Sequence, residues 1–425
     1  MNDVASPGHS EPLGRRRVVI TGTGLVSCLG SSLGEVMNHL LEGRSGIRLM
    51  DDPHISYAGQ INPTIWAKLS HQYLSGQGLK RCDLASQYGY VAGMLALEEA
   101  GIDENGLYNP YRCACLIGSG LGAVHTMQHQ GERRLREQSL SPLFMPAFIA
   151  HQGNALLTQK MGWKGASYGI QAACATGAYS IIAAAQHIEQ GQADLALCGG
   201  TEAPLLPLIV EGFAACRALA PFSREAHEAS RPWDKERNGF VIAEGAGVLC
   251  LESLEHARER SATILAEYVG GAWTSDAHHL TAPYPYGDSL AHCIYRSYGG
   301  EKEDQQPKVN CINAHATSTL LGDVAEVNAL RLVFGDQLPS LPLYATKSLM
   351  GHSLGAAGAI EAIVSIGTLL RQEIHPTTNL QQRDECMKDL DIVVQRRKSC
   401  ISSVLSLSCG FGGHNSAILL KRWEE

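Results

Sequence analysis

The stretch Arg17-Val18-Val19-Ile20-Thr21-Gly22-Thr23-Gly24 places an apolar run directly before a turn built of glycines and other small residues. A short, continuous apolar run of this kind is typical of a strand buried on both faces. The same succession of strand, small-residue turn and helix recurs at 115–120, 195–200 and 309–314. Strands that alternate with helices in this way predict an α/β fold.

Size and charge narrow the classes of function. A chain of 425 residues can bury a sizeable core, either as two ordinary domains or as one large double unit. Its formal net charge of −8 gives no global basic field, so we expect no nucleic-acid partner. No run approaches the roughly 18 consecutive apolar residues that a membrane-spanning helix needs. We therefore expect no membrane partner either.

The 13 cysteines are scattered singly, apart from the pair Cys113 and Cys115, and no C-x-x-C motif is present. The N-terminus does not have the pattern of a secretory segment. This usage predicts a reduced, cytoplasmic protein without a metal site. Its cysteines are expected to be mostly small buried hydrophobes, with one reactive thiol among them.

The order of segments suggests two similar halves. Residues 1–14 are polar and aperiodic, which predicts a disordered tail. We expect an N-terminal half at 15–271 and a C-terminal half at 272–425, divided where a glycine pair follows a strand predicted at 263–269. The charged segment 301–308 is expected to be a surface connection inside the second half. A duplication would explain the similarity, but one sequence does not demonstrate it.

A candidate nucleophile lies in Tyr168-Gly169-Ile170-Gln171-Ala172-Ala173-Cys174-Ala175-Thr176-Gly177-Ala178, which precedes an Ala-rich helix predicted at 179–189. At a helix start, free N–H groups and the helix dipole favour thiolate over thiol. The same N–H groups can stabilise an oxyanion on a thioester that the sulfur attacks. Taken alone, Cys174 could equally be a buried helix cysteine.

Two histidines follow predicted strands. His315, in Asn313-Ala314-His315-Ala316-Thr317, lies where open α/β sheets bind their ligands. His352 ends Thr346-Lys347-Ser348-Leu349-Met350-Gly351-His352 and stands at a helix start, where the dipole disfavours imidazolium and keeps a neutral donor. A cysteine and two histidines at three strand ends predict one catalytic site.

These residues resemble the Cys-His-His signature of the elongating, type II kind of β-ketoacyl-ACP synthase, a thiolase-fold condensing enzyme. The likeness covers about residues 16–422 and includes Cys174, His315, His352 and Lys347. Further matching motifs are the runs at 231–240, 244–247 and 410–415. The resemblance implies two similar βαβαβαββ-type halves in a five-layered αβαβα arrangement.

The resemblance also implies a reaction. Cys174 would carry an acyl group received from acyl carrier protein, and His315 and His352 would stabilise the enolate formed as malonyl-ACP loses carbon dioxide. Lys347 would orient the histidines, and no metal or organic cofactor would be needed. A homodimer is expected, with a heterodimer containing a chain-length partner as the alternative.

Supporting roles come from the same resemblance. Glu361 would be the internal partner of Lys347, although it could also be a surface carboxylate; its apolar setting favours burial with a partner. Phe411 would act as a gate and contribute an oxyanion N–H. The remaining implied positions are an acyl tunnel at Leu121 and Phe213, phosphopantetheine contacts at Thr281, Thr317 and Thr319, and carrier-protein contacts at Lys80, Arg81 and Arg217, each of which could equally be a solvated surface charge.

The chain departs from the family pattern in three places. It has Leu407-Ser408-Cys409 where Asn-Ser-Phe is usual, so we expect Cys409 to reshape the acyl tunnel behind the gate. Ala316 replaces a common glycine, and Gln138 and Ser139 replace a basic pair. These differences suggest a dedicated carrier protein or an unusual acyl chain.

Three other functions share part of this pattern of residues. A thiolase would share a cysteine near Cys409 but has asparagine in place of His315. A non-catalytic chain-length subunit of a polyketide synthase would lack Cys174. A catalytic ketosynthase subunit of a specialised polyketide or polyene pathway would keep all three catalytic residues, so this alternative stays open.

Overall fold

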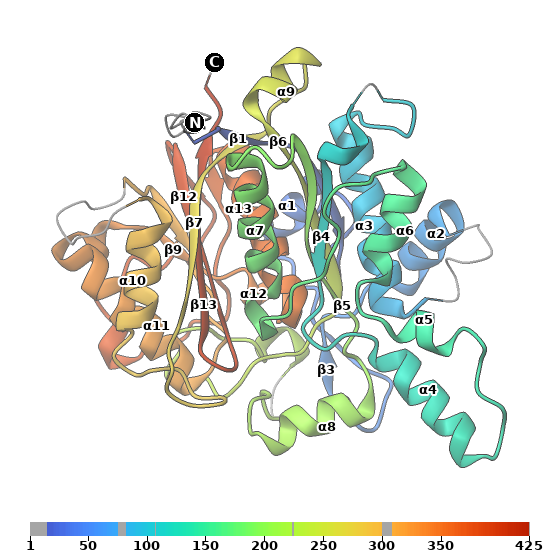
Figure 1. Ribbon diagram of the computed structural model, residues 1–425. Coiled ribbons are helices and arrows are strands. Elements are labelled where there is room, and N and C mark those ends of the chain that lie inside the picture. The colour runs from blue at the N-terminus through green and yellow to red at the C-terminus, as the bar shows by residue number, and fades with distance from the viewer. Residues whose placement is uncertain (1–14, 75–81, 107, 223–224, 300–307, 425) are drawn as a thin grey trace, which may run out of the picture.

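The computed structural model describes residues 15–74, 82–106, 108–222, 225–299 and 308–424 (Figure 1). The tail expected at 1–14 and nearly all of the connection expected at 301–308 lie outside these residues. Within them, the chain alternates strands and helices almost throughout, which confirms the predicted α/β class.

Nine strands form one continuous sheet, which consists of two successive parts that we call arms. The first arm has the order β4-β5-β6-β1 and the second has the order β7-β13-β12-β8-β9. Their bounds are β1 Val18–Val26, β4 Cys113–Gly118, β5 Leu195–Glu202, β6 Gly245–Ser253, β7 Ala266–Ser275, β8 Cys311–Asn313, β9 Leu343–Tyr344, β12 Ser403–Gly410 and β13 His414–Arg422.

The two arms repeat the same pairing senses. Outward from β1, the neighbours are antiparallel β6, antiparallel β5 and parallel β4; outward from β7, they are antiparallel β13, antiparallel β12 and parallel β8. The arms join through a short pairing of residues 18–20 with 266–268. This repetition shows directly the two similar halves that the sequence suggested.

Helices complete the five layers (Figure 1). The middle layer contains α7 (Thr176–Glu189) and α13 (Ala357–Arg371), which contact each other and both arms of the sheet. One outer layer contains α3 (Leu84–Ala100) and α6 (Gln152–Met161). The other contains α10 (Asp288–Ser297) and α11 (Leu320–Phe334). The predicted αβαβα arrangement is therefore confirmed.

Shorter elements decorate these layers. The remaining helices are α1 Leu33–Leu41, α2 Pro63–Tyr73, α4 Val124–Leu135, α5 Phe144–Phe148, α8 Pro207–Ala215, α9 Leu254–Glu259 and α12 Lys347–Met350. The remaining strands are β2 Arg48–Leu49, β3 Tyr57–Ala58, β10 Glu373–Ile374 and β11 Arg397–Lys398. Among the described residues, one helical stretch, 354–371, has the length and apolar character of a membrane span, and 89% of it is buried inside the protein. It belongs to the core.

Glycine allows the two middle helices to approach closely. A Cβ added to Gly177 of α7 would lie 2.8 Å from the backbone nitrogen of Ala359 in α13. A Cβ on Gly358 would lie 2.9 Å from the nitrogen of Ala178. These contacts hold the starts of α7 and α13 together, and each start lies just after a predicted catalytic residue.

Strand β7 differs from its prediction. It begins at Ala266 and continues through the glycine pair to Ser275, so the pair lies inside the strand and the division placed after residue 271 falls within it. A Cβ on Gly270 would meet the carbonyl oxygen of Ser297 at 2.2 Å. Gly270 therefore allows close packing against α10, Gly271 allows close packing against Ile182 of α7, and the pair does not end the strand.

Candidate active site

Cys174 occupies a short 3-10 turn, residues 173–175, immediately before α7. Ala173 has a φ of +46°, a left-handed conformation that costs a non-glycine residue about 1–2 kcal/mol. Thr176 fixes the turn, because its Oγ1 donates to the Ala173 carbonyl at 2.7 Å and accepts from the Ala172 N–H at 2.9 Å. The strained turn points Cys174 away from the helix and into the site.

The Cys174 sulfur packs in an apolar cluster that includes Leu121, Phe213 and Phe411. The backbone N–H groups of Phe411 and of Cys174 itself lower the pKa of the Cys174 thiol, which places both donors beside the nucleophile, where the oxyanion of an attacked thioester would form. Burial nevertheless raises the pKa of the thiol to about 12, and the Lys347 charge and the two N–H groups offset only part of that rise. Burial therefore favours the thiol, the opposite of the direction expected from the helix start.

His315 lies two residues after the end of β8, and hydrogen bonds from the backbone of its loop fix its position. Its N–H donates to Glu326 Oε1 at 2.6 Å, and the N–H of Ala316 donates to Oε2 of the same carboxylate at 2.8 Å. Lys347 Nζ lies 3.3 Å from His315 Nδ1. Because an ammonium group can only donate, Nδ1 must accept, and the imidazole proton resides on Nε2.

Lys347 begins α12 and forms a buried ion pair. Its Nζ donates to Glu361 Oε1 at 2.5 Å, and both side chains are about 3% exposed. Burial raises the pKa of Glu361 to about 7, and Lys347 lowers it against this effect. The structure thus gives Glu361 the buried setting and the partner that its apolar sequence context favoured.

His352 lies between α12 and α13 and is 2% exposed. Its ring meets the His315 ring edge to face at a centroid distance of 5.4 Å, and Phe240 packs against its other side at 5.0 Å. Its Nδ1 is buried without a hydrogen-bond partner. An unpaired buried acceptor is tolerated more readily than an unpaired donor, so we assign the proton to Nε2.

Both histidines are neutral at physiological pH. Burial lowers the pKa of His315 well below its ordinary value, and the nearby Lys347 and His352 lower it further. Burial and Lys347 likewise lower the pKa of His352. The neutral donor expected at position 352 is therefore present, but burial and Lys347 produce it, in place of the helix dipole.

One cavity of about 90 Å³ joins the three catalytic residues. Cys174, His315 and His352 all line it, although they come from segments far apart in sequence. Thr317 and Thr319 line it too, with their hydroxyls 3.0 Å apart, and the exposed Thr281 reaches its edge. The structure therefore brings the predicted triad and the three predicted phosphopantetheine contacts to one place.

The predicted gate and tunnel residues lie on one side of Cys174. Phe411 stands in the turn between β12 and β13, with its ring 6.2 Å from that of Phe213 in α8. Phe213 also packs edge to face with Phe240 at 5.5 Å. Leu121 belongs to the same apolar cluster. This wall is suited to an acyl chain attached to Cys174.

Cys409, which we also expected in the acyl tunnel, packs apart from Leu121 and Phe213. It packs in the core cluster under α10 and α11, whereas Leu121 and Phe213 pack with Cys174. It lines the catalytic cavity on the side of His315 and Thr317. The reason is strand alternation: Gly410 faces the nucleophile turn, so the preceding side chain faces the opposite side of the sheet.

The predicted carrier-protein contacts are only partly described. Lys80 and Arg81 lie outside the described residues. Arg217 is exposed and lines a separate hollow of about 580 Å³, together with His54 and Phe222. Phe240 lines both this hollow and the catalytic cavity. Arg217 is therefore next to the site but not inside its cavity.

Two buried carboxylates escaped the sequence analysis. Glu326 holds the His315 loop through two backbone N–H groups. Glu202, at the end of β5, accepts from Ser119 Oγ and from the N–H groups of Gly120, Leu121 and Gly355, which ties the two halves together. Burial raises the pKa of each to about 7. Neither stands in a motif whose spacing would reveal it.

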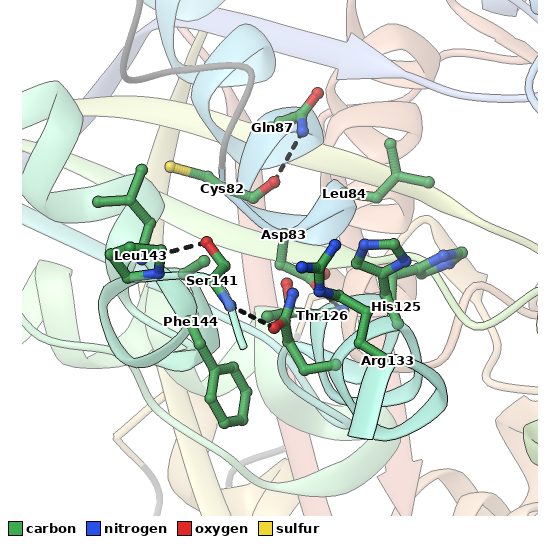
Figure 2. Close-up of a pocket in the computed structure, with 14 residues that line it drawn as sticks. Cys82, Asp83, Leu84, Gln87, His125, Thr126, Arg133, Ser141, Leu143 and Phe144 are labelled. Carbon is green, nitrogen blue, oxygen red and sulfur yellow. Dashed lines mark hydrogen bonds between the residues drawn. The ribbon is translucent and has the colours of Figure 1, made fainter. Parts of the chain in front are cut away.

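A larger cavity lies outside this site. About 760 Å³ opens between the start of α3, α4 and α5, lined by Asp83, His125, Arg133 and Phe144 among others (Figure 2). It contains none of the catalytic residues. Across the part of the chain that the structure describes, no group of His, Cys, Asp and Glu side chains could hold a metal ion.

Comparison with known proteins places this geometry in a family. The model of the β-ketoacyl synthase N-terminal domain matches residues 15–257, and that of the C-terminal domain matches residues 265–381. The chain is 43% identical to 3-oxoacyl-[acyl-carrier-protein] synthase I, chloroplastic, of Arabidopsis thaliana, over 95% of this chain and 86% of that protein. It is 37% identical to 3-oxoacyl-[acyl-carrier-protein] synthase 2 of Coxiella burnetii, over 96% of this chain and 99% of that protein.

Solved structures agree with the fold. A type II polyketide-synthase ketosynthase, in complex with its acyl-carrier protein and bound to the hexaketide, is 30% identical and superposes with a TM-score of 0.86 over 96% of this chain and all of that one. The ishigamide ketosynthase/chain length factor has the same identity and TM-score over 97% of this chain and all of that one. The chain therefore belongs to the β-ketoacyl synthase family.

Proposed function

We propose that the protein is a 3-oxoacyl-ACP synthase that extends fatty acyl chains by decarboxylative Claisen condensation. The observation that carries this proposal is the shared cavity of Cys174, His315 and His352, with the Lys347–Glu361 pair behind it. Relatives named 3-oxoacyl-[acyl-carrier-protein] synthase match nearly the whole chain, which supports acyl carrier protein as the partner.

In the first half-reaction, the Cys174 sulfur attacks the thioester carbon of acyl-ACP. Because the resting group is a thiol, its proton leaves as the new S–C bond forms and is taken up by the departing carrier thiolate. The N–H groups of Cys174 and Phe411 stabilise the oxyanion of the tetrahedral intermediate. The acyl chain then lies against Leu121 and Phe213.

In the second half-reaction, malonyl-ACP enters past Thr317 and Thr319. The Nε2 protons of His315 and His352 donate to the malonyl thioester oxygen. The bond to the carboxylate breaks, carbon dioxide leaves, and the electron pair becomes an enolate held by the two donors. That carbanion attacks the acyl carbon, and Cys174 leaves with a proton. The electron pair of the new carbon–carbon bond comes from the broken bond to the malonyl carboxylate. We therefore propose that the reaction needs no cofactor.

We also propose a homodimer in the cytoplasm. Large apolar side chains are exposed on and around α4 and α5, including Leu135, which is 86% exposed, and Met145, which is 60% exposed. Such a patch on a water-soluble protein indicates a protein partner. The 13 cysteines, all within the described residues, form no disulfide, which fits a reducing compartment.

A second candidate is the catalytic ketosynthase subunit of a type II polyketide or polyene pathway, paired with a chain-length subunit. The likeness to a type II polyketide-synthase ketosynthase and to the ishigamide ketosynthase/chain length factor favours it. Co-purification from the native cell separates the two candidates. A homodimer active on saturated acyl-ACP supports fatty-acid elongation, and a stable heterodimer restricted to unsaturated or aryl chains supports the alternative.

Two variants test the proposed chemistry. Cys174→Ala should abolish both condensation and labelled acyl loading while the circular dichroism spectrum stays that of the wild type. His315→Ala should lose decarboxylation of malonyl-ACP more severely than acyl loading of Cys174. Full condensing activity in Cys174→Ala, or equal loss of both steps in His315→Ala, would contradict the assigned roles.

A further inference from the structure

A small side lobe adjoins the catalytic cavity beside His315. Its volume is about 40 Å³, and it shares Cys409, His315 and Thr317 with the main cavity as common walls. A water-sized group needs roughly 10–15 Å³ of such space. The lobe therefore has room for a small substituent such as a methyl group, and not for an acyl chain.

The lining of the lobe is mostly apolar. Leu290 of α10 and Ala325 of α11 form its far wall, and neither lines the main cavity. The two carboxylates in its wall are already engaged: Asp276 accepts from the Asn415 side chain at 2.6 Å and from the Tyr284 N–H at 3.0 Å, and Glu326 accepts from two backbone N–H groups. An apolar group therefore meets little competition from water in this lobe.

Cys409 sets the width of the opening. It stands at the common wall, where the family pattern has phenylalanine, and a phenyl ring there would occupy much more space than a thiol. It also stands two residues before Phe411, whose N–H lies beside the Cys174 sulfur. The lobe thus begins next to the point where the new carbon–carbon bond forms.

The lobe opens on the side of the cavity where the extender unit would lie, away from the wall that would hold the acyl chain. The acyl wall of Leu121 and Phe213 packs in a different cluster from Cys409. Of the three predicted phosphopantetheine contacts, Thr281 and Thr319 line the main cavity alone, and Thr317 stands where the two spaces meet. An arm that contacts all three therefore passes the opening of the lobe without filling its inner part at Leu290 and Ala325. What remains to enter the lobe is a group on C2 of the extender, the carbon between its carboxylate and its thioester.

We propose that Cys409 admits extender units substituted at C2, with methylmalonyl-ACP as the substrate of this class. This proposal rests on the condensing function proposed above. The methylmalonyl C2–carboxylate bond breaks, carbon dioxide leaves, and the resulting enolate attacks the acyl carbon on Cys174. The products are a 2-methyl-3-oxoacyl-ACP and, with one proton taken up, the free Cys174 thiol.

The test compares malonyl-ACP and methylmalonyl-ACP as extenders for the purified, acyl-loaded enzyme. The wild type should use both, with kcat/KM values within about tenfold of each other. A pocket distinguishes one methyl group by about 10–200-fold. Cys409→Phe should therefore lower kcat/KM for methylmalonyl-ACP about 10–200-fold more than that for malonyl-ACP. Ala325→Val, which narrows the lobe from its far wall, should shift the ratio in the same direction.

Two controls distinguish a failure of this inference from a failure of the proposed condensing function. Cys400→Phe makes the same substitution at an exposed cysteine and should leave the ratio unchanged. Labelled acyl loading of Cys174 shows that each variant is folded. Turnover of malonyl-ACP without methylmalonyl-ACP in the wild type, or an unchanged ratio in both lobe variants, overturns the inference alone. Loss of turnover with both extenders in the wild type overturns the proposed function as well.

Discussion

At the scale of single residues, the site combines a half-buried thiol with two neutral histidines, so no catalytic group carries a resting charge except the Lys347–Glu361 pair. The pKa of Cys174 is raised to about 12 by burial, and those of both histidines are lowered by burial and by Lys347. Neutral groups suit a reaction whose charges develop only in transition states, because preformed N–H donors then stabilise the oxyanion and the enolate.

The raised pKa of Cys174 predicts its response to alkylation. Below the pKa, the thiolate fraction rises about tenfold with each pH unit, and the thiolate is the reacting form. The rate of iodoacetamide labelling of Cys174 should therefore rise continuously from pH 6 to pH 9. Mass spectrometry of the peptide that contains Cys174 measures this rate. The exposed Cys400 in the same sample reports on the reagent. A plateau near neutral pH would show instead that the thiolate is the resting form.

Removing one partner of the buried ion pair should destabilise the fold. Glu361→Gln leaves the Lys347 ammonium buried without its carboxylate, which typically lowers the free energy of unfolding by about 3–5 kcal/mol. Urea denaturation measures the loss. Glu385→Gln is the matched control, because it breaks an exposed pair with Lys388 that is worth about 0–1 kcal/mol. Equal stability of the two variants would mean that Lys347 and Glu361 are not both charged.

At the scale of elements, the starts of α7 and α13 carry the chemistry, and glycine sets how closely they approach. Gly177→Ala places a methyl 2.8 Å from the nitrogen of Ala359. Overpacking of this kind costs about 1–3 kcal/mol. Gly212→Ala on α8 meets nothing within 4 Å and should stabilise by about 0.5–1 kcal/mol, as alanine does in a helix. Thermal denaturation of both variants checks the sign of each change.

The sequence predicted best the features that local pattern controls. The patterns correctly located His315 just after a buried strand and Cys174 just before a helix, and one cavity joins them to His352; however, no strand of the described residues directly precedes Cys174, and α12 separates His352 from β9. Features that depend on distant neighbours were missed. The pKa of Cys174 depends on how much apolar surface encloses it, and the side of Cys409 depends on which strand residue faces the nucleophile turn. Glu326 acts through backbone groups that no motif records.

At the scale of the whole molecule, the five layers bury the catalytic residues but leave one apolar region uncovered. Exposed leucine and methionine side chains gather on α4, on α5 and on the segment between them. These elements extend away from the layered core at one end of the molecule (Figure 1). A second copy that covered the region would remove this apolar surface from water, at roughly 25 cal/mol per Å².

Charges placed in this region should therefore separate the proposed dimer. Leu140 and Met145 are 44% and 60% exposed, and aspartate at both positions would have to be desolvated in the interface. The matched control changes Leu332 and Leu370, which are 54% and 48% exposed on α11 and α13, to aspartate. Analytical ultracentrifugation should find a dimer of 45.6 kDa chains for the wild type and the control pair, and a monomer for the Leu140→Asp/Met145→Asp variant. Two results would contradict the proposal that this region is the dimer interface. One is a wild-type protein that is monomeric at micromolar concentration, and the other is a Leu140→Asp/Met145→Asp variant that remains a dimer.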